Sequence, residues 1–255
     1  GDDPEEMLRR LDSGAFSEAD VQNCADLWAH DHGYAAHVRE INSATPARFN
    51  ADARRLFEAA GSAGKLIVFA VRVDSFPRDE GAATFYLGTN DPARLTALRR
   101  AILRDASTLP IAGEYMHRDA FDIADRYGKD MFVAIERLGT DRLPALFAVK
   151  AWIDGLPFLQ AGFSDRMMQR IGRLLPDHLP RAMRRFRDRF AHHLLLKVPE
   201  VAIGETRALL AALFADTEAD HFECSAAIAA KAFLHRFVAA GAAVRYRAVH
   251  RRAVA

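Results

Sequence analysis

The residue types best suited to chemistry are concentrated between Glu114 and Asp119, where two carboxylates, a phenol, an imidazole and a guanidinium occur together. A guanidinium donates two parallel hydrogen bonds to a carboxylate, and an imidazole takes up or releases a proton near neutral pH. Arg118 is therefore a candidate ligand for an acidic group, and His117 is a candidate proton acceptor. The alternative is a junction between two parts of the chain, held by structural ion pairs.

Two other groups of histidines could bind ligands. His192 and His193 are neighbours in an apolar stretch, and neighbours on a strand point to opposite faces, so the two side chains are poorly placed to bind one metal. The spacing of His30, His32 and His37 permits metal binding, but the segment is polar and offers no cysteine. We predict a core or edge role for the first pair and no metal site.

Cationic residues are distributed unevenly. The segment 165–189 holds eight arginines and three aspartates, and the segment 231–252 holds five arginines, one lysine and no acid. The whole chain has a net charge of only +1, so the rest of it is strongly acidic. An acidic body with a cationic face attracts a polyanion, either nucleic acid or an anionic bilayer.

The first cationic segment has the pattern of two short amphipathic helices, separated where Pro176 and Pro180 interrupt it. Such helices lie in the headgroup region of a bilayer, with arginines on the lipid phosphates. The alternative is a solvated arginine face over a core of Met and Phe. The predicted membrane-binding residues are Arg166, Arg170, Arg173, Arg181, Arg184, Arg185, Arg187, Arg189, Lys231, Arg236, Arg245 and Arg247.

Composition limits the class of protein. No run of 18 uncharged apolar residues occurs, which predicts that no segment spans a bilayer, and the acidic start of the chain is unlike a signal peptide. Two distant cysteines, Cys24 and Cys224, favour a reducing compartment over a disulfide framework. We expect the chain to be an internal piece of a longer protein.

Hydrophobic patterns predict an α+β fold. Helices are expected at 4–12, 17–30 and 47–60, followed by a buried strand at 65–73. Two strand–helix–strand units follow, and the mostly helical segment 118–190 is inserted between them. The first unit comprises 84–88, 91–105 and 110–116, the second 192–198, 204–216 and 221–224. Two such units indicate a split sheet of ferredoxin-like type.

Several long strings resemble a known family. They are GEYMHRDAFDIADRYGKDMF at 113–132, LGTDRLP at 138–144, HHLLLK at 192–197 and KAFLHRFVAAGAAVRYRAVH at 231–250, with a further stretch at 45–76. These strings resemble the FAD-linked, quinone-dependent respiratory D-lactate dehydrogenases of bacteria, and the resemblance covers nearly the whole chain.

The resemblance implies an enzyme that oxidises D-lactate to pyruvate and passes electrons to membrane quinone. By that mapping, 1–74 is the tail of a vanillyl-alcohol-oxidase-type FAD domain. Residues 75–116 and 190–227 belong to a cap (substrate) domain with the ferredoxin-like split sheet, and 117–189 with 228–255 form the inserted membrane-binding domain. His117 and Arg118 become candidate catalytic residues. The implied location is peripheral, on the cytoplasmic face of the bacterial inner membrane.

The implied cofactor is FAD. The string Gly61-Ser-Ala-Gly-Lys-Leu-Ile-Val68 is similar to a glycine-rich element of this flavoprotein superfamily, and Gly64, Ile67 and Val68 are its expected contacts with the cofactor. The alternative is a helix-ending glycine before a core strand. Most flavin contacts in the family come from a segment that precedes this chain, so we expect these 255 residues alone neither to hold FAD firmly nor to oxidise lactate.

A non-enzymatic, arginine-rich module that binds nucleic acid or another polyanion is the alternative function. The phenylalanines follow apolar registers and form no stacking string for bases, which favours lipid over nucleic acid. On this basis, exchange of Arg184, Arg185 and Arg187 for Glu is expected to release the protein from anionic vesicles and leave the fold intact.

Overall fold

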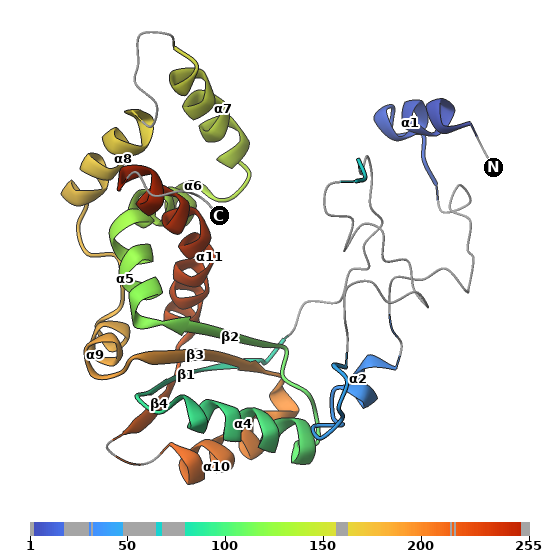
Figure 1. The fold of residues 1–255 in the computed structure, drawn as a ribbon, viewed down its shortest axis with the longest axis vertical. Coiled ribbons are helices and arrows are strands. Elements are labelled where there is room, and N and C mark those ends of the chain that lie inside the picture. Colours follow the sequence, from blue (N-terminus) through green and yellow to red (C-terminus); the bar gives the residue numbers. More distant parts are fainter. Residues whose placement is uncertain are drawn as a thin grey trace. The chain divides into compact units, whose positions relative to one another are not determined.

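The computed structural model describes residues 3–17, 31, 33–47, 65–67, 80–156, 163–214, 216 and 218–250. The chain divides into two compact units, Gly1–Phe76 and Pro77–Ala255, and each is described by itself. Figure 1 shows the ribbon and its element labels.

The first unit contains two described helices. Helix α1 (Pro4–Asp12) begins where the predicted helix begins, because the Asp3 carboxylate accepts a hydrogen bond from the Glu5 amide and Pro4 fits the first helical turn. Helix α2 is the single turn Tyr34–His37. The predicted helices at 17–30 and 47–60 lie outside the described residues except for their first residues, which are not helical.

The prediction of a buried strand at 65–73 is wrong for its first three residues, and 68–73 lies outside the described residues. Lys65, Leu66 and Ile67 have no regular secondary structure. Leu66 is 46 % exposed and Ile67 is 81 % exposed. A strand needs hydrogen-bonded neighbours, and all the named strands of the described residues belong to a sheet in the other unit.

The second unit is built on a four-stranded sheet. Its strands are β1 (Ala83–Thr89), β2 (Ala112–His117), β3 (His192–Val198) and β4 (Ala219–Glu223). They lie in the order β2-β3-β1-β4, and each neighbouring pair is antiparallel. Helix α4 (Pro92–Asp105) connects β1 to β2, and α10 (Ile203–Leu213), after the short helix η2 (Glu200–Ala202), connects β3 to β4. The positions of these predicted strands and helices are confirmed to within a few residues.

Local sequence signals explain where α4 begins. The Asp91 carboxylate accepts a hydrogen bond from the Ala93 amide at 2.9 Å, and Pro92 occupies the first turn, as predicted. The buried face of the helix carries Leu98 and Ile102.

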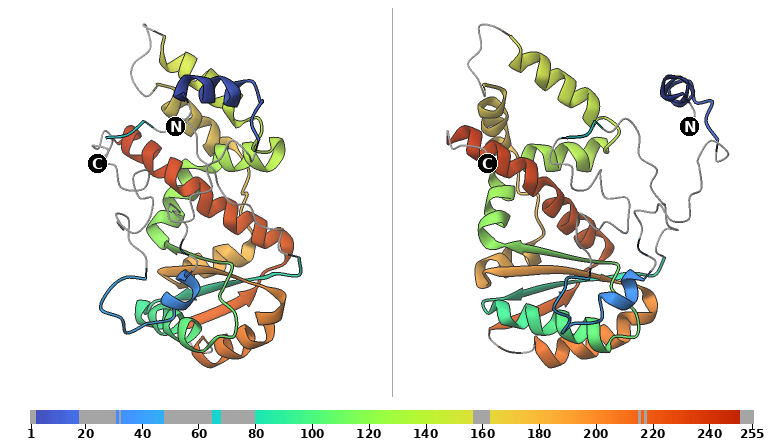
Figure 2. Two further views of the ribbon diagram at one scale, coloured as in Figure 1. Left: turned by 90° about the vertical axis from the view of Figure 1, so that its right-hand side faces the viewer. Right: turned by 45° about the vertical axis from the view of Figure 1, so that its right-hand side comes forward.

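The two faces of the sheet are covered by different helices (Figures 1 and 2). Strand residues alternate between the faces, so Phe85 and Leu87 pack with α4 and α10, whereas Tyr86 packs on the opposite side. That opposite face carries what we call the helical lobe. Its helices are α5 (Arg118–Tyr127), α6 (Lys129–Leu138), α7 (Leu143–Asp154), α8 (Phe163–Leu174), α9 (Arg181–Arg189) and α11 (Ala226–Val249).

Helix α9 lies close against the sheet because β1 has no side chain at the point of contact. A Cβ atom at Gly88 would lie 2.9 Å from Phe186 Cδ1 and closer still to the ring of Phe190. Both phenylalanines are buried in the core between the sheet and the lobe. Glycine at this position is therefore required by packing.

Helix α11, with 24 residues, is long and apolar enough by composition to cross a membrane. This finding departs from the prediction made from uncharged runs, because α11 stays strongly apolar although it contains Lys231 and Arg236. In the structure one side of α11 packs into the core through buried Ala232, Val238 and Ala242. Only 22 % of its most apolar stretch of 18 residues is buried, so most of that stretch lies outside the core.

The described residues thus combine one antiparallel sheet with predominant helix, consistent with an α+β fold. Assignment of the first unit to a flavin domain and of the sheet to a cap stays a prediction, as do the proposed domain boundaries.

Candidate functional site

Three titratable side chains meet where strand β2 ends and strand β3 begins. Because His117 pairs with His192 in the sheet register, their side chains lie on the same face, and the ring centroids are 5.2 Å apart. Tyr115, two residues before His117 and therefore also on that face, places its hydroxyl 2.8 Å from His192 Nδ1. Tyr115 is 49 % exposed, so this Tyr115–His117–His192 cluster is open to solvent.

His117 also forms the start of α5. Its Nδ1 accepts a hydrogen bond from the Asp119 amide at 3.2 Å, so in the neutral ring the proton resides on Nε2. The backbone amide of Arg118 donates to the Ala191 carbonyl at 2.8 Å, which fixes this corner against the start of β3. The predicted catalytic histidine therefore has a helix-capping role in addition to its place in the cluster.

His192 is the better-placed proton acceptor. Burial lowers its pKa from the ordinary value, and the neighbouring His117 lowers it further. A lowered pKa keeps the ring neutral at physiological pH, with the tautomer set by the Tyr115 hydroxyl. The sequence left open which of the two adjacent histidines faces a site, and the pairing of β2 with β3 places His192 beside His117.

Among the described residues, the side chain of Arg118 makes no hydrogen bond or ion pair with the Tyr115–His117–His192 cluster. Its side chain is half-buried and, within the part of the chain that the structure describes, makes no ion pair. Its charge acts on His193, on the opposite face of the sheet, where it helps burial lower the pKa to about 4.

The flavin contacts expected from the sequence are mostly outside the described residues. Gly64 and Val68 are not described, and Ile67 projects an exposed side chain from irregular backbone. A flavin site needs an enclosed apolar cleft. Only Lys65, Leu66 and Ile67 of this segment are described, so the expected flavin contacts stay a prediction.

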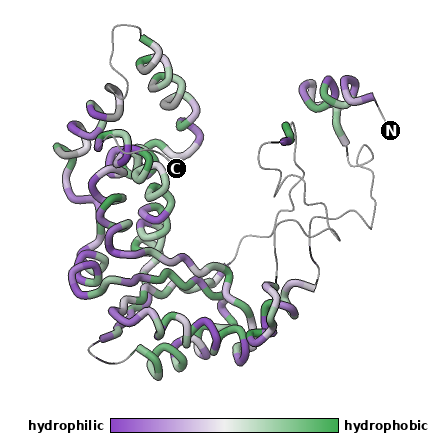
Figure 3. The backbone as a smooth tube through the Cα atoms, viewed as in Figure 1, coloured by the Kyte–Doolittle hydropathy of each residue, from purple (hydrophilic) through white to green (hydrophobic). Residues whose placement is uncertain are grey.

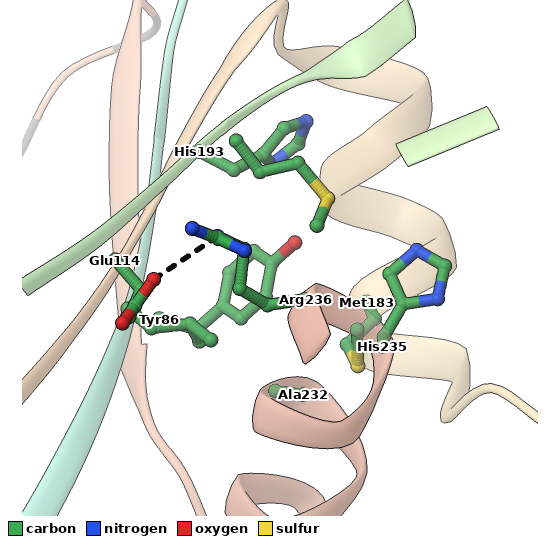
Figure 4. Close-up of a pocket in the computed structure, with 9 residues that line it drawn as sticks. Tyr86, Glu114, Met183, His193, Ala232, His235 and Arg236 are labelled. Carbon is green, nitrogen blue, oxygen red and sulfur yellow. Dashed lines mark ion pairs between the residues drawn. The ribbon is translucent and has the colours of Figure 1, made fainter. Parts of the chain in front are cut away.

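A small pocket lies between the sheet and the helical lobe (Figure 4). The guanidinium of Arg236 pairs with Glu114 across it, with Nε 3.0 Å from Oε2. Buried Tyr86, His193 and His235 also line the pocket. Burial raises the pKa of Tyr86 and lowers that of His235 to about 3, so both groups are neutral at physiological pH.

Six of the predicted membrane-binding cations make ion pairs among the described residues of the unit. Arg184 makes a bidentate pair with Asp125 of α5 and also contacts Asp177, whose pKa it lowers to about 2. Arg187 makes a bidentate pair with Asp122 of the same helix. The other four pairs are Arg189 with Asp220, Lys231 with Glu136, Arg236 with Glu114, and buried Arg245 with Asp130.

These contacts correct the expectation that Arg184 and Arg187 can be reversed without harm to the fold. Each guanidinium neutralises carboxylates between α9 and α5, so a Glu at either position would place like charges together. Arg170, Arg181 and Arg185 are exposed and make no ion pair among the described residues. They are the predicted cations with a charge available to an outside partner.

The remaining three members of that set are less informative. Arg166 is half-buried and interacts within the protein, and Arg247 is half-buried. The side chain of Arg173 lies outside the described residues.

Asp125, Asp177 and His178 form a cluster that sequence reasoning did not identify. One ligand atom of each lies within 4.8 Å of the others, the spacing of a metal site. Arg184 already binds both carboxylates, however, and a cation would compete with its charge. The arrangement therefore favours an internal ion-pair network.

Comparison with known proteins assigns the chain to a family. Residues 84–255 match the sequence model of a family described as "D-lactate dehydrogenase, membrane binding". The quinone-dependent D-lactate dehydrogenase of Escherichia coli (strain K12) is 48 % identical over 254 residues, which cover 98 % of this chain and 44 % of that protein.

Two further relatives carry the same name. The protein of Haemophilus influenzae is 44 % identical over 100 % of this chain and 46 % of its own length. That of Corynebacterium glutamicum is 42 % identical over 100 % of this chain and 45 % of its own length. The chain spans about half the length of these relatives, and by its family match it belongs to the membrane-binding D-lactate dehydrogenase family.

Proposed function

We propose that the chain is part of a quinone-dependent enzyme that oxidises D-lactate to pyruvate. The observation that carries this proposal is the similarity, over 98–100 % of the chain, to three relatives of that name. In the reaction D-lactate loses two electrons and two protons, and a quinone gains them to become a quinol. The alternative of a module that binds nucleic acid has no support in the comparisons.

The chemistry that the described residues offer is proton transfer. Oxidation at C2 of lactate requires removal of the hydroxyl proton, and a neutral imidazole is a suitable acceptor. His192 is neutral because its pKa is lowered, and the Tyr115 hydroxyl at 2.8 Å holds the ring in one orientation. His117 lies beside it, with the two ring centroids 5.2 Å apart.

FAD, which the family resemblance implies, would supply the electron acceptor. The described residues do not form its site, so we assign them no step at the flavin. We propose that most contacts with FAD come from the part of the full-length protein that this chain does not cover. Arg118 remains a candidate for the substrate carboxylate, since it is half-buried and carries a guanidinium next to His117.

The second part of the proposal concerns location. We propose that the helical lobe holds the enzyme on an anionic bilayer, at the cytoplasmic face of the inner membrane, within reach of quinone. The exposed charges of Arg170, Arg181 and Arg185 support this role. Each cation near an anionic surface contributes about 1 kcal/mol to attachment.

The test of the enzymatic proposal is D-lactate:quinone reductase activity of the full-length protein, with L-lactate as the stereochemical control. His192→Gln is expected to lower kcat/KM for D-lactate by about 100-fold, the usual contribution of a general base. His221→Gln is the matched control, because His221 is a strand histidine of the same sheet whose Nδ1 contacts the Phe214 carbonyl. No D-lactate oxidation, or equal loss in both variants, would contradict the proposal.

A further inference from the structure

The outermost helix of the lobe has an unusual surface. Helix α7 lies at the far end of the lobe from the sheet, with α8 as its principal packing partner (Figure 1). The helix reads LPALFAVKAWID and contains one cation, Lys150, before its final Asp154. Figure 3 shows this helix coloured mainly as hydrophobic.

One side of α7 is apolar and open. Ala145, Ala148, Val149 and Trp152 are all exposed, and their spacing places them on one face of the helix. Val149 is 57 % exposed and Trp152 is 68 % exposed. A contiguous apolar face with an exposed tryptophan marks a site of interaction rather than a solvated surface.

The charges around this face indicate what covers it. Exposed Arg142 immediately precedes α7, and exposed Arg170 lies on α8. Leu174, the last residue of α8, is 87 % exposed and adds a further apolar side chain to a helix that itself carries arginines. Tryptophan and apolar residues beside arginines are the composition of a segment that lies at a membrane interface.

We propose that α7 inserts its face of Ala145, Ala148, Val149 and Trp152 into the boundary between headgroups and acyl chains of an anionic bilayer. Arg142, which immediately precedes α7, and Arg170 on the neighbouring α8 bind lipid phosphate, so attachment combines burial of apolar surface with charge. This inference rests on the proposed membrane function of the lobe and adds the residues that enter the lipid. It differs from attachment by arginines alone, which would leave Trp152 in water.

Tryptophan fluorescence of the full chain tests the proposal, because the sequence has only two tryptophans, Trp28 and Trp152. In the Trp28→Phe protein the signal comes from Trp152 alone. Vesicles of phosphatidylcholine with phosphatidylglycerol, brominated along the acyl chains, are expected to shift its emission to shorter wavelength and to quench it. Flotation of the same samples reports binding independently.

The outcomes separate the two levels of the proposal. Flotation with quenching supports insertion, whereas flotation without quenching overturns insertion and leaves the membrane function standing. Absence of flotation contradicts both. Oligomerisation or burial of the face by another part of the protein would keep Trp152 emission the same with and without vesicles, which also overturns insertion.

A matched pair of variants adds a quantitative test. Val149→Ser is expected to weaken partitioning into the vesicles about threefold to tenfold, and Trp152→Ser at least about tenfold, since each removes apolar surface from the lipid. Val201→Ser is the control, because Val201 is 80 % exposed but lies in η2, outside the lobe. Equal partitioning of Val149→Ser and Val201→Ser would overturn the proposal.

Discussion

At the scale of single residues, the candidate site depends on sheet register. His117 and Arg118 were accessible to sequence reasoning because reactive residue types are concentrated there. The contact between Tyr115 and His192 was not, because it joins residues 77 positions apart and exists only through the pairing of β2 with β3. Local patterns predict each strand, whereas the register between strands requires the packed sheet.

The first prediction concerns the coupling between His117 and His192. The charged form of His117 lowers the pKa of His192, so His117→Gln is expected to raise the pKa of His192 while burial still keeps it below the ordinary value. NMR titration of the imidazole protons measures this shift. An unchanged or lower His192 pKa in the variant would show that the two rings do not interact. The control variant His221→Gln should leave the pKa of His192 unchanged.

The second prediction concerns acid stability. His178, His193 and His235 are buried, and their pKa values are lowered to about 4, 4 and 3. Unfolded histidines titrate near 6.5, so as pH falls the unfolded state takes up protons first. The free energy of unfolding is therefore expected to be maintained above about pH 6.5 and to fall between about pH 6.5 and pH 3.

The magnitude follows from the width of that window. At pH 5 each of these histidines lowers the free energy of unfolding by about 2 kcal/mol. His235→Phe, whose ring would pack against Phe121, should make the dependence of urea unfolding on pH shallower. The variant His117→Gln, at a half-buried position outside the core, should not change the slope, and equal slopes for the wild type and His235→Phe would contradict this account.

At the scale of elements, the contacts of α9 were only partly accessible from the sequence. Its arginines were interpreted as a lipid-binding face, yet Arg184 and Arg187 bind Asp125 and Asp122 of α5. A signal existed in the spacing. The two arginines are three residues apart on α9 and the two aspartates are three residues apart on α5, so each set lies on one face of its helix. Recognition that the two faces meet requires knowledge of how the helices pack.

The third prediction tests the role of these ion pairs. Arg184→Gln leaves the Asp125 and Asp177 carboxylates without their principal partner and is expected to lower the free energy of unfolding by about 1–3 kcal/mol. Arg185→Gln, on the exposed side of the same helix, should change it by less than about 0.5 kcal/mol. Urea unfolding measures both, and similar effects would contradict the assigned roles.

The fourth prediction tests the contact between β1 and α9. Gly88→Ala introduces a Cβ atom that overlaps Phe190, so we expect a loss of about 1–3 kcal/mol in the free energy of unfolding. Gly113→Ala is the control, because a Cβ atom in that strand position meets no neighbour within 4 Å among the described residues. Thermal or urea unfolding compares the two variants, and a Gly88→Ala protein as stable as the control would show that α9 packs elsewhere.

At the scale of the whole molecule, charge distribution and the long family strings indicated a membrane-associated dehydrogenase, and the comparisons place the chain in that family. Which arginines form internal ion pairs and which stay exposed was not predictable, because composition cannot distinguish an arginine paired with an aspartate from an exposed one. The buried strand predicted at 65–73 failed at Lys65–Ile67, because apolar composition alone does not supply the neighbouring strands that a sheet requires.

The most direct test of the central claim is flotation of the protein with anionic vesicles after charge reversal on opposite sides of the sheet. Arg170→Glu with Arg185→Glu alters the helical lobe, and Arg99→Glu with Arg100→Glu makes the same change of net charge on α4. The account predicts that the lobe variant loses at least about 30-fold in partitioning and that the α4 variant is nearly unaffected. Equal losses, or a larger loss for the α4 variant, would contradict attachment through the lobe.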